Sequence, residues 1–262
     1  MDRVDVDAVA ARGFVLTAEL ADGFDSGAHH HARHQLLYAE SGVLWLEGAA
    51  GQWLLPPERA AWIPGSLEHR VRCRRPARLC TVYLDRALEL EPAPASAIAV
   101  FAVPPVCREL ARYGARWGPE RDADDPVAER YFAALAALCR EWAREPLPWR
   151  LPVARSRELA RAMAHLLQDL AAPLDVPGAA RAAGVSPRTL ARRFAEETGG
   201  SARQFLQRAR MMRAMELLDV PARRVGEIAR AVGFDSQSAF TTAFRAFAGE
   251  SPGAYRRRAS PL

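Results

Sequence analysis

A repeated segment near the C-terminal end of the chain constrains the fold more than any other feature of the sequence. Residues 180–186 read Ala-Arg-Ala-Ala-Gly-Val-Ser, and residues 229–235 read Ala-Arg-Ala-Val-Gly-Phe-Asp. After one inserted residue the alignment continues with four more pairs: Phe194 with Phe244, Gly199 with Gly249, Ser201 with Ser251, and Phe205 with Tyr255. Such internal repetition predicts two similar folding units in this part of the chain.

Each copy of the repeat has the pattern of two short helices joined by a tight turn. Gly184 and Gly233 suit a turn that requires a positive φ angle. A Ser or Asp follows at the expected N-cap position of the second helix, and in the first copy Ser186 is followed by Pro187, which favours the first helical turn. The pattern is typical of a helix-turn-helix. Between the copies, apolar residues at helical spacing predict one long helix over residues 201–218.

The charge of the chain is distributed unevenly between its two parts. Residues 1–150 contain 18 Arg and 21 acidic residues, a net charge of −3, whereas residues 151–262 contain 18 Arg and 10 acidic residues, a net charge of +8. A basic half next to an acidic half is typical of proteins that bind a polyanion through one domain. A solvated basic face would give the same count, so the charge supports the helix-turn-helix interpretation without establishing it.

The first hundred residues have the pattern of β structure. Short runs rich in Val, Leu, Trp and Tyr are separated by Gly and Pro, which predicts strands over residues 42–47, 51–55, 59–63, 69–73 and 79–84. Short, evenly spaced strands of this kind indicate an antiparallel sandwich or barrel. The proline-rich segment 91–96 is expected to end this region.

The middle of the chain has a helical period. Apolar residues recur at helical spacing over residues 105–117 and 126–144, and the three prolines between residues 145 and 152 indicate a linker. We therefore predict an α+β multidomain chain with a β domain over residues 1–100, a helical linker or dimerisation segment over 101–153, and an all-α domain over 154–262. The two helices are candidates for a homodimer interface, and the alternative is that they simply pack on the β domain.

The repeat region resembles the DNA-binding domain of the AraC/XylS family of transcription regulators. The first unit carries the family pattern at Ser186, Arg188, Leu190, Arg192 and Phe194. The connecting helix and the second unit continue it at Arg210, Ala214, Leu217, Leu218, Ile228, Ala229, Gly233, Phe234, Ser238, Phe240, Phe244, Gly249, Ser251, Pro252, Tyr255 and Arg256. Two positions depart from the pattern, because Ala239 stands where an aromatic residue is usual and Thr242 where Arg is common. The resemblance implies two helix-turn-helix units that contact successive major grooves of double-stranded DNA.

Candidate DNA-binding residues follow from which side chains the helices leave outside the core. A second helix over residues 187–198 would bury Leu190 and Phe194, and it would direct outward Arg188, Thr189, Arg192 and Arg193. In the other unit, burial of Phe240, Phe244 and Phe247 leaves outward Gln237, Ser238, Thr241, Thr242 and Arg245. Arg can bind guanine or a phosphate, Gln can pair with adenine, and a Thr methyl can contact the thymine methyl.

Histidines are concentrated in the N-terminal domain, where four of the six lie within residues 29–34. If residues 29–35 are extended, His29, His31 and Gln35 share one face and His34 points to the other. Together with His69, this spacing resembles the two cupin motifs, with Gln35 where Glu is usual and Ser66 in place of a glycine. The resemblance implies a small β-barrel that holds one divalent transition metal, Zn, Ni, Fe or Cu, through His29, His31, Gln35 and His69. The alternative is a polar rim around an organic effector pocket. Five aromatic residues are candidates to line that pocket, although aromatic residues at strand spacing more often form plain core: Tyr38, Trp45, Trp53, Trp62 and Tyr83.

These observations predict a cytoplasmic transcription regulator that binds DNA and whose cupin-like domain senses a small molecule, a divalent metal, or both. We expect a homodimer, with RNA polymerase as a further candidate partner and no membrane association, since no apolar run is long enough to span a bilayer. No catalytic residues are predicted, because the sequence contains no Ser-His-Asp, P-loop or dinucleotide-binding pattern. The four scattered cysteines favour neither a disulfide scaffold nor a zinc finger. Two alternatives stay open: a metal-dependent cupin enzyme fused to a DNA-binding module, and an architectural DNA-binding protein with an inactive barrel.

Overall fold

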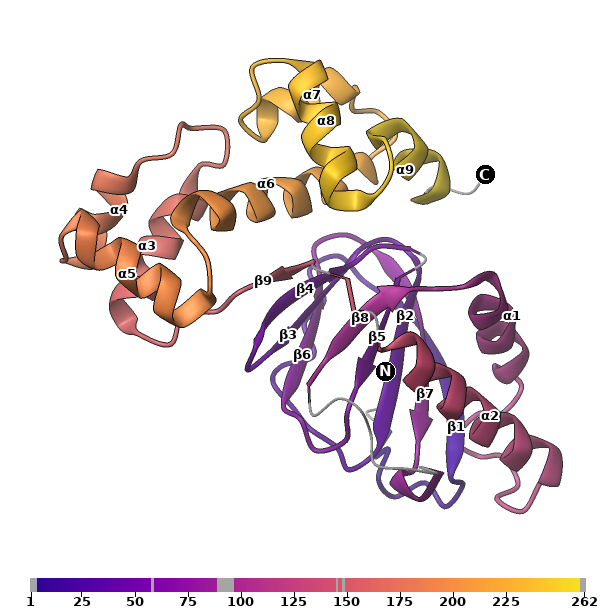
Figure 1. Cartoon of the computed structure of the whole chain (residues 1–262). Helices are drawn as coiled ribbons and strands as arrows, with labels where there is room; N and C mark the ends of the chain where they lie inside the picture. The colour runs from indigo at the N-terminus through magenta and orange to yellow at the C-terminus, as the bar shows by residue number, and fades with distance from the viewer. Residues whose placement is uncertain (1–3, 58, 89–96, 145, 148, 260–262) are drawn as a thin grey trace. The chain divides into compact units, whose positions relative to one another are not determined.

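The computed structural model describes residues 4–57, 59–88, 97–144, 146–147 and 149–259, and within it the chain folds into two units, Met1–Pro148 and Trp149–Leu262. The first unit is built from strands with two helices, and the second is almost entirely helical (Figure 1). This division confirms the α+β architecture. The expected segment 101–153 contributes its helices to the first unit, and the second unit begins at Trp149, ahead of the expected residue 154.

Two antiparallel sheets form the first unit. One has the strand order β1-β7-β2-β5-β8, and in the other β3 pairs with both β6 and β4. The first sheet comprises β1 (Gly13–Leu20), β2 (His34–Ser41), β5 (Arg59–Ile63), β7 (Ala77–Leu84) and β8 (Ala99–Ala102). The second contains β3 (Leu44–Gly48), β4 (Gly51–Leu55) and β6 (His69–Cys73). The predicted closure of these sheets into a barrel stays a prediction.

The strands bury side chains on both faces of the larger sheet. In β2, Leu37 and Ala39 pack into the core between the two sheets, whereas Leu36 and Tyr38 point to the opposite face. This alternation follows from the two-residue period of a strand. A strand buried on both sides carries no polar stripe, so β2 has an almost unbroken run of buried residues.

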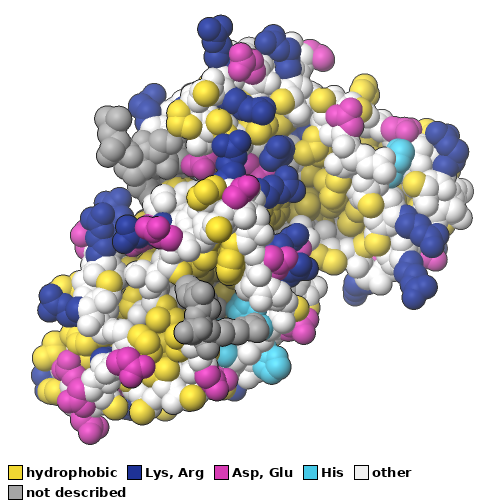
Figure 2. Space-filling view, turned by 180° about the vertical axis from the view of Figure 1, so that it is seen from behind, with side chains coloured by type: hydrophobic (Ala, Val, Ile, Leu, Met, Phe, Trp, Pro, Cys, Tyr) yellow, Lys and Arg dark blue, Asp and Glu magenta, His cyan; other side chains and the backbone are white. Residues whose placement is uncertain are grey.

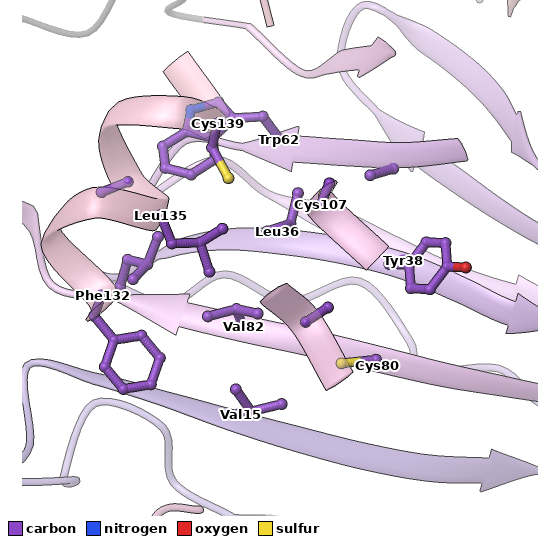
Figure 3. Close-up of a cluster of buried hydrophobic side chains, with 14 of the residues drawn as sticks. Val15, Leu36, Tyr38, Trp62, Cys80, Val82, Cys107, Phe132, Leu135 and Cys139 are labelled. Carbon is purple, nitrogen blue, oxygen red and sulfur yellow. The ribbon is translucent and has the colours of Figure 1, made fainter. Parts of the chain in front are cut away.

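Two helices cover the outer face of the larger sheet. They are α1 (Pro105–Gly114) and α2 (Pro126–Trp142), which follow the short 3-10 helix η1 (Arg86–Leu88) and β8. Figure 3 shows Phe132, Leu135 and Cys139 of α2 directed at side chains of the sheet. Packing on the strands was one of the two roles expected for these helices. All four cysteines are buried and free.

The predicted strands lie close to those observed, with three omissions in the first unit. Strands β4, β5 and β6 have the predicted bounds, and β3 and β7 differ from them by a few residues at most. Strands β1, β2 and β8 were not predicted individually. The proline-rich segment 91–96 lies outside the described residues. No helix of the described chain is long and apolar enough to cross a membrane.

The second unit consists of two helix-turn-helix pairs joined by a long helix. After β9 (Arg150–Leu151) and α3 (Arg157–Gln168), the first pair is α4 (Val176–Ala183) and α5 (Pro187–Thr198). The connecting helix is α6 (Ala202–Leu218), and the second pair is α7 (Val225–Ala231) and α8 (Gln237–Ala248), followed by α9 (Pro252–Ala259). The predictions for residues 187–198 and 201–218 are confirmed. Gly184 and Gly233 both have a left-handed backbone, with φ of 70° and 79°.

The two turns differ by one residue. In the first pair the Ser186 hydroxyl accepts the N–H of Thr189 (3.1 Å), and in the second the Ser236 hydroxyl accepts the N–H of Ala239 (3.1 Å). The expectation that Asp235 caps the second helix was wrong, because the inserted residue of the repeat lies within the turn and moves the cap to the next position. The hydroxyl of Ser236 then takes the same place as that of Ser186.

Two side chains connect distant segments of the second unit. The half-buried guanidinium of Arg210 on α6 donates to three backbone carbonyls: Leu170 (2.9 Å), Ala172 (2.6 Å) and Gly233 (3.3 Å). One side chain thus connects the loop before α4 with the turn of the second pair. Trp149, only 1% exposed, donates its indole N–H to the carbonyl of Phe247 (3.1 Å) and stacks on that ring.

Candidate DNA interface and metal centre

The first recognition helix, α5, buries one face and exposes the other. Leu190 and Phe194 are fully buried, and the Phe194 ring packs near Phe205 of the connecting helix, with ring centroids 5.9 Å apart. Arg188 and Arg192 are exposed, as expected from the helical period. Arg192 lies 2.9 Å from the carboxylate of Glu196, one turn further along the same helix. An exposed ion pair of this kind is weak, so Arg192 can exchange it for a contact to a nucleic acid at small cost.

Two residues expected to face outward from α5 are directed elsewhere. Arg193 is half-buried between two carboxylates, Glu158 of α3 (3.6 Å) and Glu197 of its own helix (3.7 Å). Thr189 is half-buried, and its hydroxyl lies 2.9 Å from that of Ser186. Both residues therefore contribute to the framework, and the exposed basic surface of α5 consists of Arg188 and Arg192.

The second recognition helix, α8, has the same framework with different exposed side chains. Phe240 and Phe244 are fully buried, and the Phe244 ring meets Tyr255 of α9 edge to face. Phe247, expected in the same buried stripe, is only partly buried beside Trp149. The residues predicted to face outward are exposed except Thr241, which is half-buried: Gln237, Ser238, Thr242 and Arg245. The exposed surface of α8 is therefore mainly uncharged, with its cation in the last turn.

The predicted metal ligands come together from two distant segments. The backbones of His29 and His69 form a short antiparallel bridge, with reciprocal N–H to carbonyl distances of 2.9 and 2.8 Å. One ligand atom from each of His29, His31 and His69 lies within 4.8 Å of the others. Figure 2 shows a group of histidine side chains at one place on the surface and a histidine apart from them, whereas the Arg side chains are dispersed. His31 and His69 are buried and His29 is half-buried, so the cluster is most accessible beside His29.

A tight turn holds this cluster in place. The carbonyl of His31 accepts the N–H of Ser66 (2.7 Å), and Gly65 passes so close to Ala32 that a Cβ atom would lie 2.1 Å from the Ala32 oxygen. Ser66 has a φ of 68° and is the one non-glycine residue with a positive φ in the described chain. A left-handed backbone favours glycine. This geometry gives a physical reason for the glycine that the cupin pattern places here.

Hydrogen bonds to the backbone fix how each histidine presents its ring. The Nδ1 atoms of His29, His31 and His69 lie 3.0, 2.8 and 2.9 Å from the carbonyl oxygens of Gly27, Arg33 and Leu67, respectively. A carbonyl can only accept, so each Nδ1 carries a proton and leaves Nε2 as the candidate ligand atom. Within the described chain, the buried Nε2 of His69 has no hydrogen-bond partner. Three imidazoles that each bring one ring nitrogen to the same place are a donor set that suits a divalent transition metal.

Burial favours the neutral form of two of these imidazoles, His31 and His69. Desolvation lowers the pKa of His31, and it lowers the pKa of His69 to about 4. At neutral pH both rings are therefore available as ligands without losing a proton first.

Gln35 faces the same cluster and His34 does not. The Oε1 atom of Gln35 lies 3.2 Å from Nε2 of His31, and its Nε2 donates to Oγ1 of Thr81 (2.9 Å). His34 points to the other side of β2, where its ring stacks on Trp62 and its Nδ1 accepts the N–H of Gly65 (2.9 Å). The expected strand over residues 29–35 was wrong in extent, because β2 begins at His34. The expected opposition of Gln35 and His34 holds nevertheless, since both lie on the strand.

The neighbours of Gln35 were predicted only in part. Thr81 was not predicted, and Tyr83 was a candidate for the effector pocket without a named partner. Both approach Gln35 because β7 pairs with β2, and no local pattern shows that register. Glu196 was identifiable, because it lies four residues after Arg192 on the same helix.

The aromatic residues divide between core and a cavity. Tyr38 and Trp62 belong to the core under the helices, and Trp53 to the core between the sheets. Trp45 lines a cavity of about 400 Å³ with residues that include Phe24, Gln52 and Arg72.

Comparisons with known proteins also identify a helix-turn-helix domain in the region of the repeat. A family profile described as "Helix-turn-helix domain" matches residues 179–258. The transcriptional regulator NimR of Escherichia coli is 30% identical over 240 residues, which cover 90% of this chain and 84% of NimR. The transcriptional activator RhaR of Pectobacterium carotovorum is 34% identical over 127 residues, 48% of this chain and 43% of RhaR. A solved structure of the DNA-binding domain of AdpA in complex with a target DNA is 37% identical, covers 41% of this chain and 99% of that domain, and has a TM-score of 0.38.

Proposed function

Because this chain belongs to the AraC/XylS family, it is a transcription regulator with an AraC-type DNA-binding domain, and we propose that its N-terminal unit senses a ligand through a metal bound by the histidine cluster. The observation that carries this proposal is the convergence of one ring nitrogen from each of His29, His31 and His69, which lie within 4.8 Å of one another. A metal ion in this position supplies a Lewis acid to which an effector can bind directly. Gln35 is the candidate fourth ligand, since its amide oxygen faces His31.

The proposed role is sensing and not turnover. An enzyme of the cupin type needs an acid or base beside the metal, and the hydroxyl groups that approach Gln35 belong to Thr81 and Tyr83. Burial raises the pKa of Tyr83 to about 12, so its phenol keeps its proton at neutral pH. The relatives described above carry the names of transcription regulators, which also favours a sensor.

We assign base recognition to the exposed faces of α5 and α8. Arg188 and Arg192 are the proposed guanine or phosphate contacts of the first unit. The second unit offers Gln237, Ser238, Thr242 and Arg245, and the half-buried Arg193, Thr189 and Thr241 are proposed to support the helices. Effector binding at the histidine cluster would change the affinity for DNA by a coupling free energy that is the same in both directions.

We further propose that the regulator is a homodimer that uses the outer surface of α1 and α2. These helices bury one side on the sheet and leave apolar side chains exposed on the other: Val106 (52%), Tyr113 (47%) and Val127 (56%). Apolar side chains exposed together are typical of a protein interface.

The test of the sensing proposal is the metal content of full-length protein loaded with zinc or nickel. Wild-type protein is expected to hold one ion per chain and to gain thermal stability on loading, because an ion that binds only the folded state stabilises it. His31→Ala should lose both the ion and the gain. His30→Ala is the matched control, since His30 is exposed and lies outside the converging group. Equal loss in both variants would indicate an unstructured chelating segment, and wild-type protein without metal would overturn the metal-based sensor.

A further inference from the structure

We propose that the ligand sensed at the histidine cluster is a small anion that binds through a carboxylate group. This inference rests on the proposed metal site and concerns the charge that surrounds it. The donor set brings no negative charge to the ion.

All four candidate ligands are uncharged. Histidine binds a metal as the neutral imidazole, so His29, His31 and His69 bring no charge to the ion. The amide of Gln35 is neutral in either orientation of its oxygen and nitrogen. Within the described chain, the group of converging ligand atoms contains no carboxylate and no thiolate. A divalent ion bound here would therefore keep both of its positive charges.

The next layer of side chains does not neutralise this charge. Gln35 is held by the uncharged hydroxyls of Thr81 (2.9 Å) and Tyr83 (3.4 Å). The buried charged residue nearby is a cation, Arg33, whose guanidinium lies 5.4 Å from the centre of the Phe14 ring and donates to backbone carbonyls. The acid that acts on His31 is Asp7, which is exposed to solvent and accepts the N–H of Ala32.

An uncompensated charge in a mostly buried site is costly, and a ligand that brings the opposite charge relieves that cost. His29 is more exposed than His31 and His69, so a small ligand can approach beside it. An anion gains the full attraction of the ion there, whereas a neutral molecule of the same shape does not. Among organic anions, a carboxylate binds zinc through oxygen, as the side chains of Asp and Glu do.

The inference is tested first on the wild-type chain. Full-length protein is titrated with cobalt(II) in acetate or in acetamide, which has nearly the same shape without the charge, at equal ionic strength. The measurement is made at about pH 6, below the range in which metal-held water itself ionises. We expect acetate to raise the cobalt affinity and to shift its visible absorption bands, and acetamide to do neither. Equal effects of acetate and acetamide would overturn the inference.

Variants at Gln35 separate charge from shape. Gln35→Glu places a carboxylate where the amide is, so it should raise cobalt affinity roughly tenfold or more and abolish the effect of acetate, since two charges about 4 Å apart interact strongly even in a polar site. Gln35→Leu removes a ligand without adding charge, so it should weaken cobalt binding but keep the preference for acetate over acetamide. Gln168→Glu, which adds the same charge at an exposed position of the other unit, should behave as wild type.

The outcomes distinguish this inference from the function on which it rests. Cobalt binding without a preference for acetate would overturn the anion and leave the metal site in place. The same holds if Gln35→Glu retains the full effect of acetate. No cobalt binding by the wild-type chain would overturn both. If Gln35→Glu does not fold, the comparison of acetate with acetamide on wild-type protein and on Gln35→Leu decides the question.

Discussion

The two helix-turn-helix pairs have the same framework and different exposed surfaces. The buried positions of both helices carry large apolar side chains. Leu190 and Phe194 of α5 correspond to Phe240 and Phe244 of α8. The exposed positions do not match, because Arg192 of the first pair aligns with Thr242 of the second. The difference shows that the helical framework and the surface that reads DNA are carried by separate sets of residues.

The position of charge along the two recognition helices differs as well. Arg188 and Arg192 lie in the first half of α5, whereas Arg245 lies in the last part of α8. In helix-turn-helix proteins the N-terminal part of the recognition helix contacts base edges. We therefore expect the first pair to provide the stronger base contacts and the second to provide weaker ones through Gln237 and Ser238.

The largest expected effect tests whether the two cores are equivalent. Phe194→Ala and Phe244→Ala should each cost about 3–5 kcal/mol of local stability, because both remove a fully buried ring. Hydrogen exchange of the α5 and α8 amides in the full chain measures the two losses separately. A large loss in one pair and a small loss in the other would show that the frameworks are not equivalent.

The next effect tests whether the pairs are joined by Arg210. Arg210→Met removes a charged donor from three carbonyls and should cost about 2–3 kcal/mol. Amide hydrogen exchange should increase both in the loop before α4 and at the Gly233 turn. Arg203→Met, at an exposed position of the same helix, is the control. An increase confined to one of the two regions would mean that Arg210 does not join them.

The difference in the exposed surfaces leads to a smaller effect on DNA binding. Arg192→Ala should weaken binding to a selected site by about 1–3 kcal/mol and relax the preference at one base pair, and Thr242→Ala should cost less. The site is obtained by selecting random DNA with the full chain, and affinities are measured by fluorescence anisotropy. Arg193→Ala should affect stability more than base preference, since Arg193 pairs with Glu158. A larger effect of Thr242→Ala than of Arg192→Ala would reverse the proposed division of roles.

The smallest effect concerns the caps. Ser186→Ala and Ser236→Ala should each cost about 1 kcal/mol, because each removes one acceptor from a helix start. Hydrogen exchange of the first-turn amides of α5 and α8 measures the two losses of stability. Asp235→Ala should have a smaller effect than Ser236→Ala, and the opposite result would restore Asp235 as the cap.

Local patterns predicted the features that depend on neighbours in sequence. The bounds of α5 followed from Ser186, Pro187 and the glycine after Thr198, and the strand signals of β4, β5 and β6 from their turns. The ligand set of His29, His31, Gln35 and His69 was predicted from a resemblance in spacing, and the structure brings its histidines together. Whether they bind a metal stays a prediction.

Features that depend on distant pairing were not predictable in this way. Arg193 has the same pattern as Arg192, and it is turned into the unit by Glu158, which a helical period does not reveal. The approach of Thr81 and Tyr83 to Gln35 depends on the register between β2 and β7. The same applies to Arg210, whose three acceptors come from two other segments of the chain.

The contact between Trp149 and Phe247 has a consequence for how the chain is made. These residues are 98 positions apart, and they fix the first residue of the helical unit to one of its last helices. A growing chain emerges from the ribosome with its N-terminus first, so Trp149 is made long before the residue that partners it. In a nascent chain that ends before α8, the hydrogen bond and the ring contact with Phe247 are missing, so this link is among the last contacts of the helical unit to form.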